Sequence, residues 1–491
     1  MNRQECLFHH PRTIRKTDFC KRSNLAAPRS VAGKGSTERG AAIGNLMTQP
    51  TRIDIIGAGI SGLSTAYYLA RALAASPERK AIIHVWEKDA APGGLAGTFT
   101  TPDFTVEKFY HHIFKRDRAL QDLIADVGLQ DEIVWRPAAT GAYYFRQPYR
   151  LSSPLDLLRF TPLPFLDRLR LGWMAIHART VRDWRQLDDM SCKEYIHNVA
   201  GENVYRVVWE PLFHGKFGAY ADSISAAWLW SKLVDRGGSR NAQGHEFLGY
   251  LRGGMGRMFA AMAAALEQAG HQIHLGQTVT RLRGTGEKID AIETSAGAFQ
   301  TDLVIGCAQL PELADLLPEQ AEAYRQSLRK IGFLANVCLV LTLKQPLSDF
   351  YWTNVTEPDA PFIGVIEQTK WAERADFRQK HVVYLSAYVN QDDPRLRMDG
   401  GALLRQYLPA IRKMFPQFSE SIVESAVVWN ARYAQPIVRV GYRHLIPEIQ
   451  SPIKNLLVCA MAQIYPHDRQ MSNGVALARQ TAELAEKALC S

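Results

Sequence analysis

The chain has 491 residues, of which 46% are hydrophobic, so it can bury a large core and is too long for one ordinary domain. Its formal net charge is +9, but residues 1–46 hold nine Lys and Arg against three Asp and Glu, which leaves +3 for residues 47–491. Because most of the positive charge lies in residues 1–46, we infer no nucleic-acid partner from it. No run of about 18 apolar residues occurs, so we expect no transmembrane helix.

The cysteines are odd in number, scattered and without C-x-x-C spacing. This pattern favours neither a zinc site nor a disulfide framework, and it predicts a reducing, cytoplasmic compartment. The seven residues are Cys6, Cys20, Cys192, Cys307, Cys338, Cys459 and Cys490.

Residues 1–48 combine mixed polar composition with no sustained apolar periodicity, so we predict a disordered N-terminal extension. The segment is rich in Arg and poor in acids, which a targeting peptide would share, but it lacks a secretory apolar core. Met47 stands just before the first predicted strand, and our hypothesis is that it is the natural start. N-terminal sequencing of the native protein tests this, and a mature protein that begins at Met1 contradicts it.

The first informative motif is a glycine-rich turn between a short apolar strand, 53–56, and a helix, 63–73. The turn reads Gly-Ala-Gly-Ile-Ser-Gly. Its first glycine permits a tight turn, the second leaves room for a pyrophosphate, and the third lets the helix lie close to the strand. Free N–H groups of the first helical turn suit phosphates. We therefore predict that the following residues bind a dinucleotide: Gly57, Ala58, Gly59, Ile60, Ser61 and Gly62.

The context strengthens a motif that is weak by itself. Residues 81–86 are apolar and β-branched, as in a buried parallel strand, and Glu87 follows directly. Glu87 lies 25 residues after Gly62, which places its carboxylate to accept hydrogen bonds from the ribose hydroxyls of an adenosine.

A second glycine motif follows in residues 91–98, Ala-Pro-Gly-Gly-Leu-Ala-Gly-Thr. It resembles the motif of FAD-containing amine-oxidase-type flavoproteins, which include protoporphyrinogen oxidases and UDP-galactopyranose mutases. The resemblance implies FAD as the cofactor. It also implies a Rossmann-type FAD-binding domain interleaved with an α+β substrate domain of antiparallel sheet and helical cap. Many members carry Arg where this chain has Leu95. The cofactor-binding set then extends to Lys88, Gly93, Gly94, Leu95 and Ala96.

The resemblance also predicts the order of the domains along the chain. We expect the FAD-binding domain at 49–110, 251–310 and 436–491, and the substrate domain at 111–250 and 311–435. Within the second of these FAD-binding segments, 251–310, Val279 is expected to contribute backbone contacts at the adenine end.

Residues 108–114, Lys-Phe-Tyr-His-His-Ile-Phe, resemble the segment that passes the flavin ring in UDP-galactopyranose mutases. By this resemblance His112 borders the flavin and is our candidate for proton transfer. Two histidines without a third ligand at useful spacing predict no metal site.

The region between the two FAD-binding segments has its own patterns. Residues 142–145 and 148–151 suggest strands about a Gln147-Pro148 turn, and 154–198 is helical with interleaved Leu, Phe and Arg. That basic and apolar stretch is typical either of a helical cap over the substrate or of peripheral contact with a membrane. In the next aromatic run, Glu210, His214 and Lys216 are candidates for the pocket.

The C-terminal part, 455–475, reads as a buried strand followed by a helix start. In the family this segment closes the FAD site. Most oxidases have Gly-Asp directly after the strand, whereas this chain has Ala460-Met461 and a longer insert that is similar to the closing motif of UDP-galactopyranose mutases. The resemblance implies that Tyr465, Asn473 and Val475 contact the cofactor.

Three functions remain open from the sequence. The first is an FAD-dependent oxidoreductase that moves hydride from a C–H or C–N bond of a sizeable small-molecule substrate to the flavin. The second is a mutase that uses reduced flavin without net redox change, and the third is a non-catalytic flavin-binding protein. The sequence predicts no oligomeric state.

Overall fold

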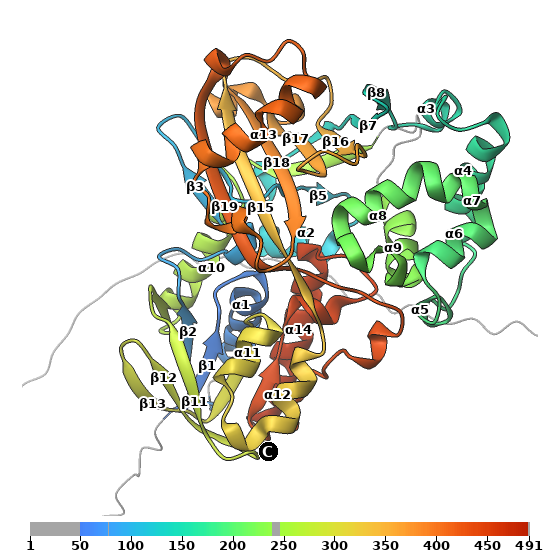
Figure 1. Ribbon diagram of the computed structural model, residues 1–491. Coiled ribbons are helices and arrows are strands. Elements are labelled where there is room, and N and C mark those ends of the chain that lie inside the picture. The colour runs from blue at the N-terminus through green and yellow to red at the C-terminus, as the bar shows by residue number, and fades with distance from the viewer. Residues whose placement is uncertain (1–49, 77, 238–245, 490–491) are drawn as a thin grey trace, which may run out of the picture. The chain divides into compact units, whose positions relative to one another are not determined.

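The computed structural model describes residues 50–76, 78–237 and 246–489. The predicted N-terminal extension and Met47 lie outside the described residues, as do Cys6, Cys20 and Cys490. The described part forms a mixed α/β fold with two large sheets (Figure 1).

The first large sheet has five strands in the order β10-β2-β1-β14-β20, and all neighbours pair in parallel. Apolar runs favour buried parallel strands because both faces of such a sheet are covered. The strands predicted at 53–56, at 81–86 and within 455–475 are confirmed. The five strands are β1 (Thr51–Ile56), β2 (Ala81–Glu87), β10 (Gln272–Leu275), β14 (Leu303–Gly306) and β20 (Leu456–Val458).

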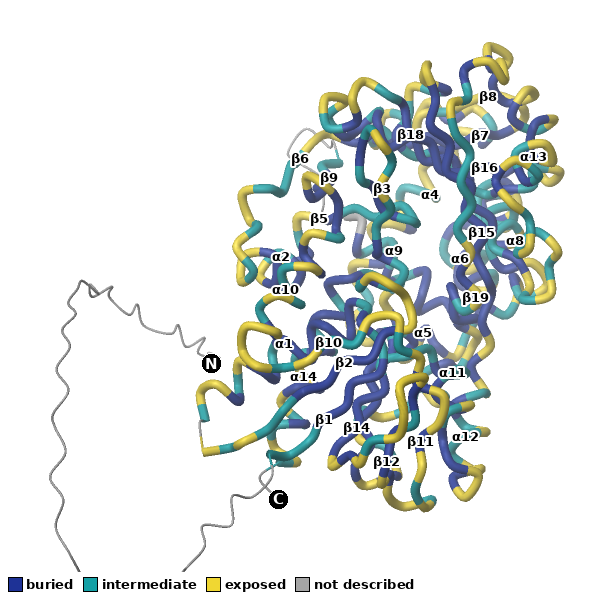
Figure 2. Tube along the Cα trace, turned by 90° about the vertical axis from the view of Figure 1, so that its left-hand side faces the viewer, coloured by how far each residue is buried: buried dark blue, intermediate teal, exposed yellow. Residues whose placement is uncertain are grey.

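Alternate residues of these strands enter two different cores, as the period of two in a strand requires. Ile53 and Ile55 pack against one layer of helices, α1 (Ile60–Ala74), α2 (Arg118–Asp126), α10 (Gly256–Gln268) and α14 (Met471–Ala488). Ile56 and Val304 pack against the opposite layer. That layer contains β11 (Val279–Gly284), β12 (Ile289–Thr294), β13 (Gly297–Gln300), α11 (Leu310–Leu316) and α12 (Glu322–Arg329). Figure 2 shows β1 and β14 in the dark blue of buried residues.

The second large sheet has seven strands in the order β19-β15-β18-β17-β16-β7-β8. Its pairs are antiparallel, as expected, except that β16 and β7 run parallel. Helix α13 (Gly400–Met414) packs on it. The strands are β7 (Thr140–Tyr144), β8 (Gln147–Arg150), β15 (Phe333–Leu343), β16 (Trp352–Val355), β17 (Gly364–Glu367), β18 (His381–Val389) and β19 (Val423–Pro436).

The predicted turn at Gln147-Pro148 is wrong. The chain turns at Phe145 and Arg146, whose φ angles are 47° and 59°, and Gln147 and Pro148 belong to β8. Proline fits there because β8 is an edge strand of the sheet. An edge strand pairs on one side only, so proline can occupy a position whose N–H is not needed for a hydrogen bond between strands.

The helical run predicted for 154–198 is confirmed and continues to residue 237. We call the helices α3 to α9 the cap. They are α3 (Pro154–Leu158), α4 (Phe165–Ala178), α5 (Arg185–Asp188), α6 (Cys192–Ala200), α7 (Glu202–Val204), α8 (Glu210–Phe217) and α9 (Ala226–Gly237). Three small sheets complete the fold. One is formed by β11, β12 and β13, the second by β3 (Thr98–Thr100) and β4 (Thr105–Glu107), and the third by β5 (Ile113–Phe114), β6 (Ile133–Pro137) and β9 (Phe247–Leu251).

Among the helices in the described ranges, none combines the length and apolar character that crossing a membrane needs.

Candidate functional site

A cavity of about 1840 Å³ begins at the carboxyl ends of β1, β2 and β14. From there it extends along the seven-stranded sheet to the cap helices α4, α8 and α9. Ligands of open parallel sheets bind outside the carboxyl ends of the strands. A drug-sized ligand fills roughly 300–1,000 Å³, so this cavity has room for two such molecules end to end.

The glycine-rich turn forms the floor of the cavity at the end of β1. Gly57 has a φ of +101°, and α1 begins at Ile60 with Gly59 as its N-cap residue. No side chain of the described residues caps this helix, so its first N–H groups are open to a ligand. Gly57, Gly59, Ile60 and Ser61 line the cavity, whereas Ala58 and Gly62 lie behind it.

The second glycine motif lies against the first. Gly93 and Gly94 have φ angles of +127° and +54°, and the Gly93 N–H donates to the Ala58 carbonyl at 2.9 Å. A Cβ on Gly59 would meet nothing in the protein closer than the Gly94 Cα, at 4.0 Å. The protein's own packing therefore does not require glycine at residue 59, and the free space is what a bound pyrophosphate would need. Leu95 and Ala96 also line the cavity.

Glu87 lies at the end of β2 with its carboxylate held between two loops. Its Oε2 accepts from the Ala58 N–H at 2.7 Å, and its Oε1 accepts from the Asp89 N–H at 2.9 Å. A carboxylate accepts about four hydrogen bonds, so it keeps capacity for two ribose hydroxyls. Lys88 lines the cavity and pairs with Glu312 at 2.9 Å, and Val279 lines it nearby on β11.

The C-terminal segment returns to the cavity from β20. Helix α14 begins at Met471, packs along α1 (Figure 1), and has no side-chain cap among the described residues. Gln470 and Met471 line the cavity, so a second helix N-terminus faces it.

None of the three closing residues expected at the cofactor lines the cavity. Val475 is fully buried between α14 and the parallel sheet, and Asn473 contacts Gln470 at 3.5 Å. The Tyr465 hydroxyl bonds to Asp188 and to Ser225 in the cap. Burial, together with the neighbouring Asp188, raises the pKa of the Tyr465 phenol, so it stays protonated as a donor.

His112 lines the cavity beside Trp352, with its Nδ1 at 3.1 Å from the Tyr351 hydroxyl. Its neighbour His111 also lines the cavity, and its Nδ1 lies 2.6 Å from the Phe109 carbonyl. Burial lowers the pKa of His111 to about 4, although that carbonyl opposes the shift. His111 is therefore neutral at neutral pH.

The opposite wall of the cavity includes three residues of the seven-stranded sheet that the sequence pattern did not indicate, Asn336, Tyr388 and Trp429. Asp468 and Arg469 also line it, and they belong to the C-terminal insert that resembles the closing motif of the mutases. Of the three pocket candidates on α8, Lys216 lines the cavity, whereas Glu210 and His214 do not. A polar Asn at the start of the apolar run 336–343 is the signal that could have pointed to the sheet residues.

These features fit FAD. One end of the cavity combines three features. They are two glycine-rich turns, two helix N-termini that no side chain caps among the described residues, and an acid at the end of β2. Together they would supply backbone donors for phosphates and flavin carbonyls and an acceptor for ribose.

Comparison with known proteins agrees with this fit. The family model described as flavin containing amine oxidoreductase matches residues 60–478. Coproporphyrinogen III oxidases of Staphylococcus aureus and Bacillus subtilis are 26% and 25% identical over 185 and 257 residues. These stretches cover 35% and 50% of this chain, and only 38% and 47% of the two relatives.

Solved structures show the same fold. A candidate protoporphyrinogen oxidase from Exiguobacterium sp. 255-15 superposes with a TM-score of 0.70 at 17% identity, covering 89% of this chain and 99% of that one. A reduced UDP-galactopyranose mutase superposes with a TM-score of 0.67 at 15% identity, covering 90% and 98%.

The family model spans most of the chain and ends within α14, so it includes both the glycine turns and the closing segment. Its members are enzymes that use a flavin, and the described cavity has the parts that FAD needs. The chain therefore belongs to the flavin containing amine oxidoreductase family.

Proposed function

We propose that the chain oxidises a sizeable, partly apolar organic molecule at a C–H or C–N bond. FAD, when bound, supplies the hydride-accepting chemistry. The observation that carries the proposal is the cavity, which continues beyond the glycine turns along the seven-stranded sheet. The space past the cofactor end is large and mostly apolar with a few polar groups, as a substrate pocket is.

The arrangement of the parallel sheet supports a Rossmann-type cofactor domain. Counted along the chain, its strands have the order 3-2-1-4-5, which is the order of the doubly wound dinucleotide-binding sheet. We propose that the first glycine turn holds the pyrophosphate and that Glu87 and Val279 hold the adenosine. The second glycine turn and the start of α14 would then hold the flavin end.

His112 is our candidate for proton transfer because it lines the cavity beside Trp352 of the seven-stranded sheet. Its hydrogen bond with Tyr351, which is buried, fixes the orientation of the ring. A positioned histidine contributes roughly 10²- to 10⁴-fold to a rate when it moves a proton.

Anaerobic mixing with candidate substrates tests the function. We expect a true substrate to bleach the flavin absorption band without any added reductant. His112→Phe should keep its FAD and slow the bleaching by about 10²-fold or more. His444→Phe, outside the cavity lining, is the matched control and should bleach at the wild-type rate.

The mutase alternative rests on the Lys108–Phe114 run and the missing Gly-Asp, and it gives the opposite result. A mutase would turn over only after reduction of the flavin with dithionite, and it would not reoxidise the flavin in each cycle. Membership of a family of flavin-dependent enzymes favours catalysis over the non-catalytic alternative.

We also propose that the outer face of α3 and α4 contacts an anionic membrane surface. Large apolar side chains that do not line the cavity are exposed there, including Leu155 (53%), Phe165 (60%) and Leu166 (66%). Residues 146–185 contain eight Arg against three Asp, which suits anionic lipids. Leu169 and Trp173 also line the cavity, so the same helix serves as its cover.

Vesicle co-sedimentation measures this contact. We expect binding to vesicles that contain phosphatidylserine, and at least a tenfold loss of binding in Leu166→Glu, because a charge replaces an inserted apolar side chain. Leu275→Glu, on a different exposed site, should bind like the wild type. Equal binding by Leu166→Glu and the wild type would show that α4 only covers the cavity.

A further inference from the structure

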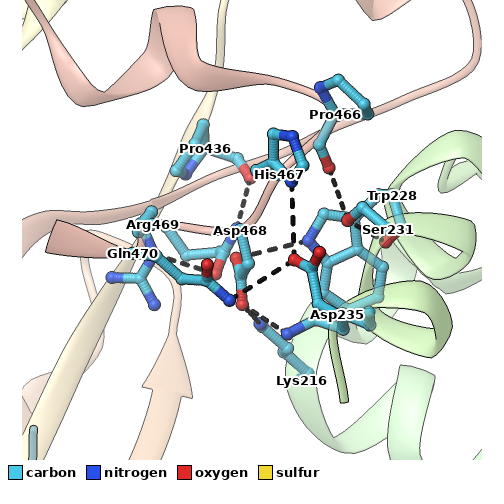
Figure 3. Close-up of polar contacts among 12 residues, drawn as sticks. Lys216, Trp228, Ser231, Asp235, Pro436, Pro466, His467, Asp468, Arg469 and Gln470 are labelled. Atoms are coloured by element: carbon cyan, nitrogen blue, oxygen red, sulfur yellow. Dashed lines mark hydrogen bonds and ion pairs between the residues drawn. The ribbon is translucent and has the colours of Figure 1, made fainter. Parts of the chain in front are cut away.

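A buried carboxylate on the cap helix α9 lies where three distant segments of the chain meet. Asp235 lines the cavity, and its side chain is 8% exposed. It forms an ion pair with Arg116 at 2.6 Å. Its Oδ2 lies 3.4 Å from His467 Nδ1 and accepts from the Gln470 side-chain amide at 3.4 Å (Figure 3). One side chain therefore joins α9, the residues before α2 and the residues before α14.

The Asp235 carboxylate is the buried member of this cluster. Burial opposes its ionisation, but hydrogen bonds from His467 and Arg116 and the charges of these groups outweigh burial and lower the pKa of the carboxyl. The Arg116 and His467 side chains are 26% and 42% exposed. Water can therefore solvate both of them, whereas a buried charge is costly to leave unpaired. The meeting point is thus fixed by Asp235 and not by its partners.

Arg116 ends the segment that carries His112. Residues 108–112 and Phe114 line the cavity. The Arg116 guanidinium lies 5.6 Å from the centre of the Phe114 ring, and the Phe114 N–H donates to Asp117 at 2.9 Å. The ion pair between Arg116 and Asp235 therefore holds the end of this segment against α9.

The start of α14 is held by the same helix. Gln470 is the N-cap residue of α14, and Gln470 and Met471 both line the cavity. Ser231 of α9 donates to the Pro466 carbonyl in the preceding loop at 2.8 Å (Figure 3). Asp235 lies one turn further along α9 and holds the end of that loop through Gln470. The position of this helix N-terminus therefore depends on α9.

We propose that Asp235 is a positioning residue for the flavin end of the site. Its contacts place the His112 segment and the N-terminus of α14 relative to each other, and both line the cavity. Groups that react must be held closely, since a misplacement of about 1 Å can cost roughly 10²-fold in rate. This inference rests on the proposed oxidation, because it takes the flavin end of the cavity as the place of the reaction.

Asp235→Asn tests the role in the FAD-loaded protein, because it keeps the size of the side chain and removes its charge. We expect a changed amplitude of the flavin bands in visible circular dichroism and about tenfold faster release of FAD, measured by the fluorescence of the free cofactor. The melting temperature of the apoprotein should stay unchanged, since the released partners reach water. A purely structural role predicts the reverse, a lower melting temperature with unchanged flavin bands.

The substrate identified by anaerobic bleaching gives a kinetic test. At saturation Asp235→Asn should bleach about ten- to hundredfold more slowly, with an unchanged substrate concentration at half-maximal rate, because positioning acts on the reacting groups and not on substrate binding.

Two further variants keep the test decisive. Arg116→Met should slow bleaching in the same direction, and it replaces Asp235→Asn if that variant does not fold. The double variant should be no slower than the slower single variant, because both changes break one ion pair. Glu373→Gln is the matched control, since Glu373 also pairs with two cations, Arg136 at 3.0 Å and Arg252 at 3.2 Å, outside the cavity lining. It should behave like the wild type.

Two results would overturn the role. One is an Asp235→Asn protein with the flavin bands and FAD release of the wild type. The other is a double variant whose loss of rate is the product of the two single losses. If no compound bleaches the wild-type flavin, the proposed oxidation fails. The flavin bands and FAD release of Asp235→Asn then still decide whether Asp235 positions the flavin end.

Discussion

Gly59→Ala should give a folded protein that has lost its FAD. The backbone at Gly59, with φ −76° and ψ −171°, suits any residue, and an added Cβ would meet the protein no closer than 4.0 Å. The same Cβ would project into the space between the two glycine turns where the pyrophosphate is expected. We expect at least a hundredfold weaker binding of FAD, about 3 kcal/mol, with an unchanged melting temperature of the apoprotein.

Gly62→Ala is the contrasting variant. Its Cβ would lie 1.8 Å from the Gly57 carbonyl oxygen, a backbone atom that cannot move aside cheaply. The apoprotein itself should therefore melt at a lower temperature. Flavin absorbance after reconstitution and calorimetry of the apoprotein separate the two effects. A Gly59→Ala protein that retains FAD at wild-type affinity would show that the phosphates lie elsewhere.

Asp188→Ala should destabilise the protein by about 3 kcal/mol, because removing one partner of a buried polar network leaves the others unpaired. Asp188 is fully buried and accepts hydrogen bonds from Ser225 Oγ at 2.9 Å, from the Arg443 N–H at 3.1 Å and from the Tyr465 hydroxyl. The network ties α5 to the segment that leads into α14. Urea denaturation of the apoprotein measures the loss.

Asp189→Ala is the matched control because Asp189 is 60% exposed and pairs only with Arg443, at 2.9 Å, among the ion pairs of the described residues. It should cost less than about 1 kcal/mol. Tyr465→Phe should lose stability and keep its FAD. If Tyr465→Phe instead lost FAD at unchanged stability, the cofactor role expected from the sequence would hold.

The cofactor end of the fold was predictable because its signals are local. A glycine-rich turn, an apolar strand before it and an acid after the next strand stand within residues 53–94, and it is their combination that has one structural meaning. The parallel strands further along the chain were also predictable, since strands buried on both faces are continuous apolar runs.

The substrate end depends on packing between distant segments. Asn336, Tyr388 and Arg469 meet only because β15 pairs with β18 and the loop before α14 folds against them. These residues are far apart in the sequence, and no periodic pattern indicates that they lie together. The misplaced turn before β8 has a related cause, since Phe145 and Arg146 adopt a left-handed conformation that their residue types rarely show.

The packing of α1 against α14 has a consequence for how the protein acquires its cofactor during synthesis. The first glycine turn leaves the ribosome roughly four hundred residues before α14, yet both helix starts face the same cavity. A nascent chain therefore carries an incomplete cradle until its last helix docks. Loading of FAD should follow release of the full chain, and a protein truncated before Met471 should be colourless even if its parallel sheet forms.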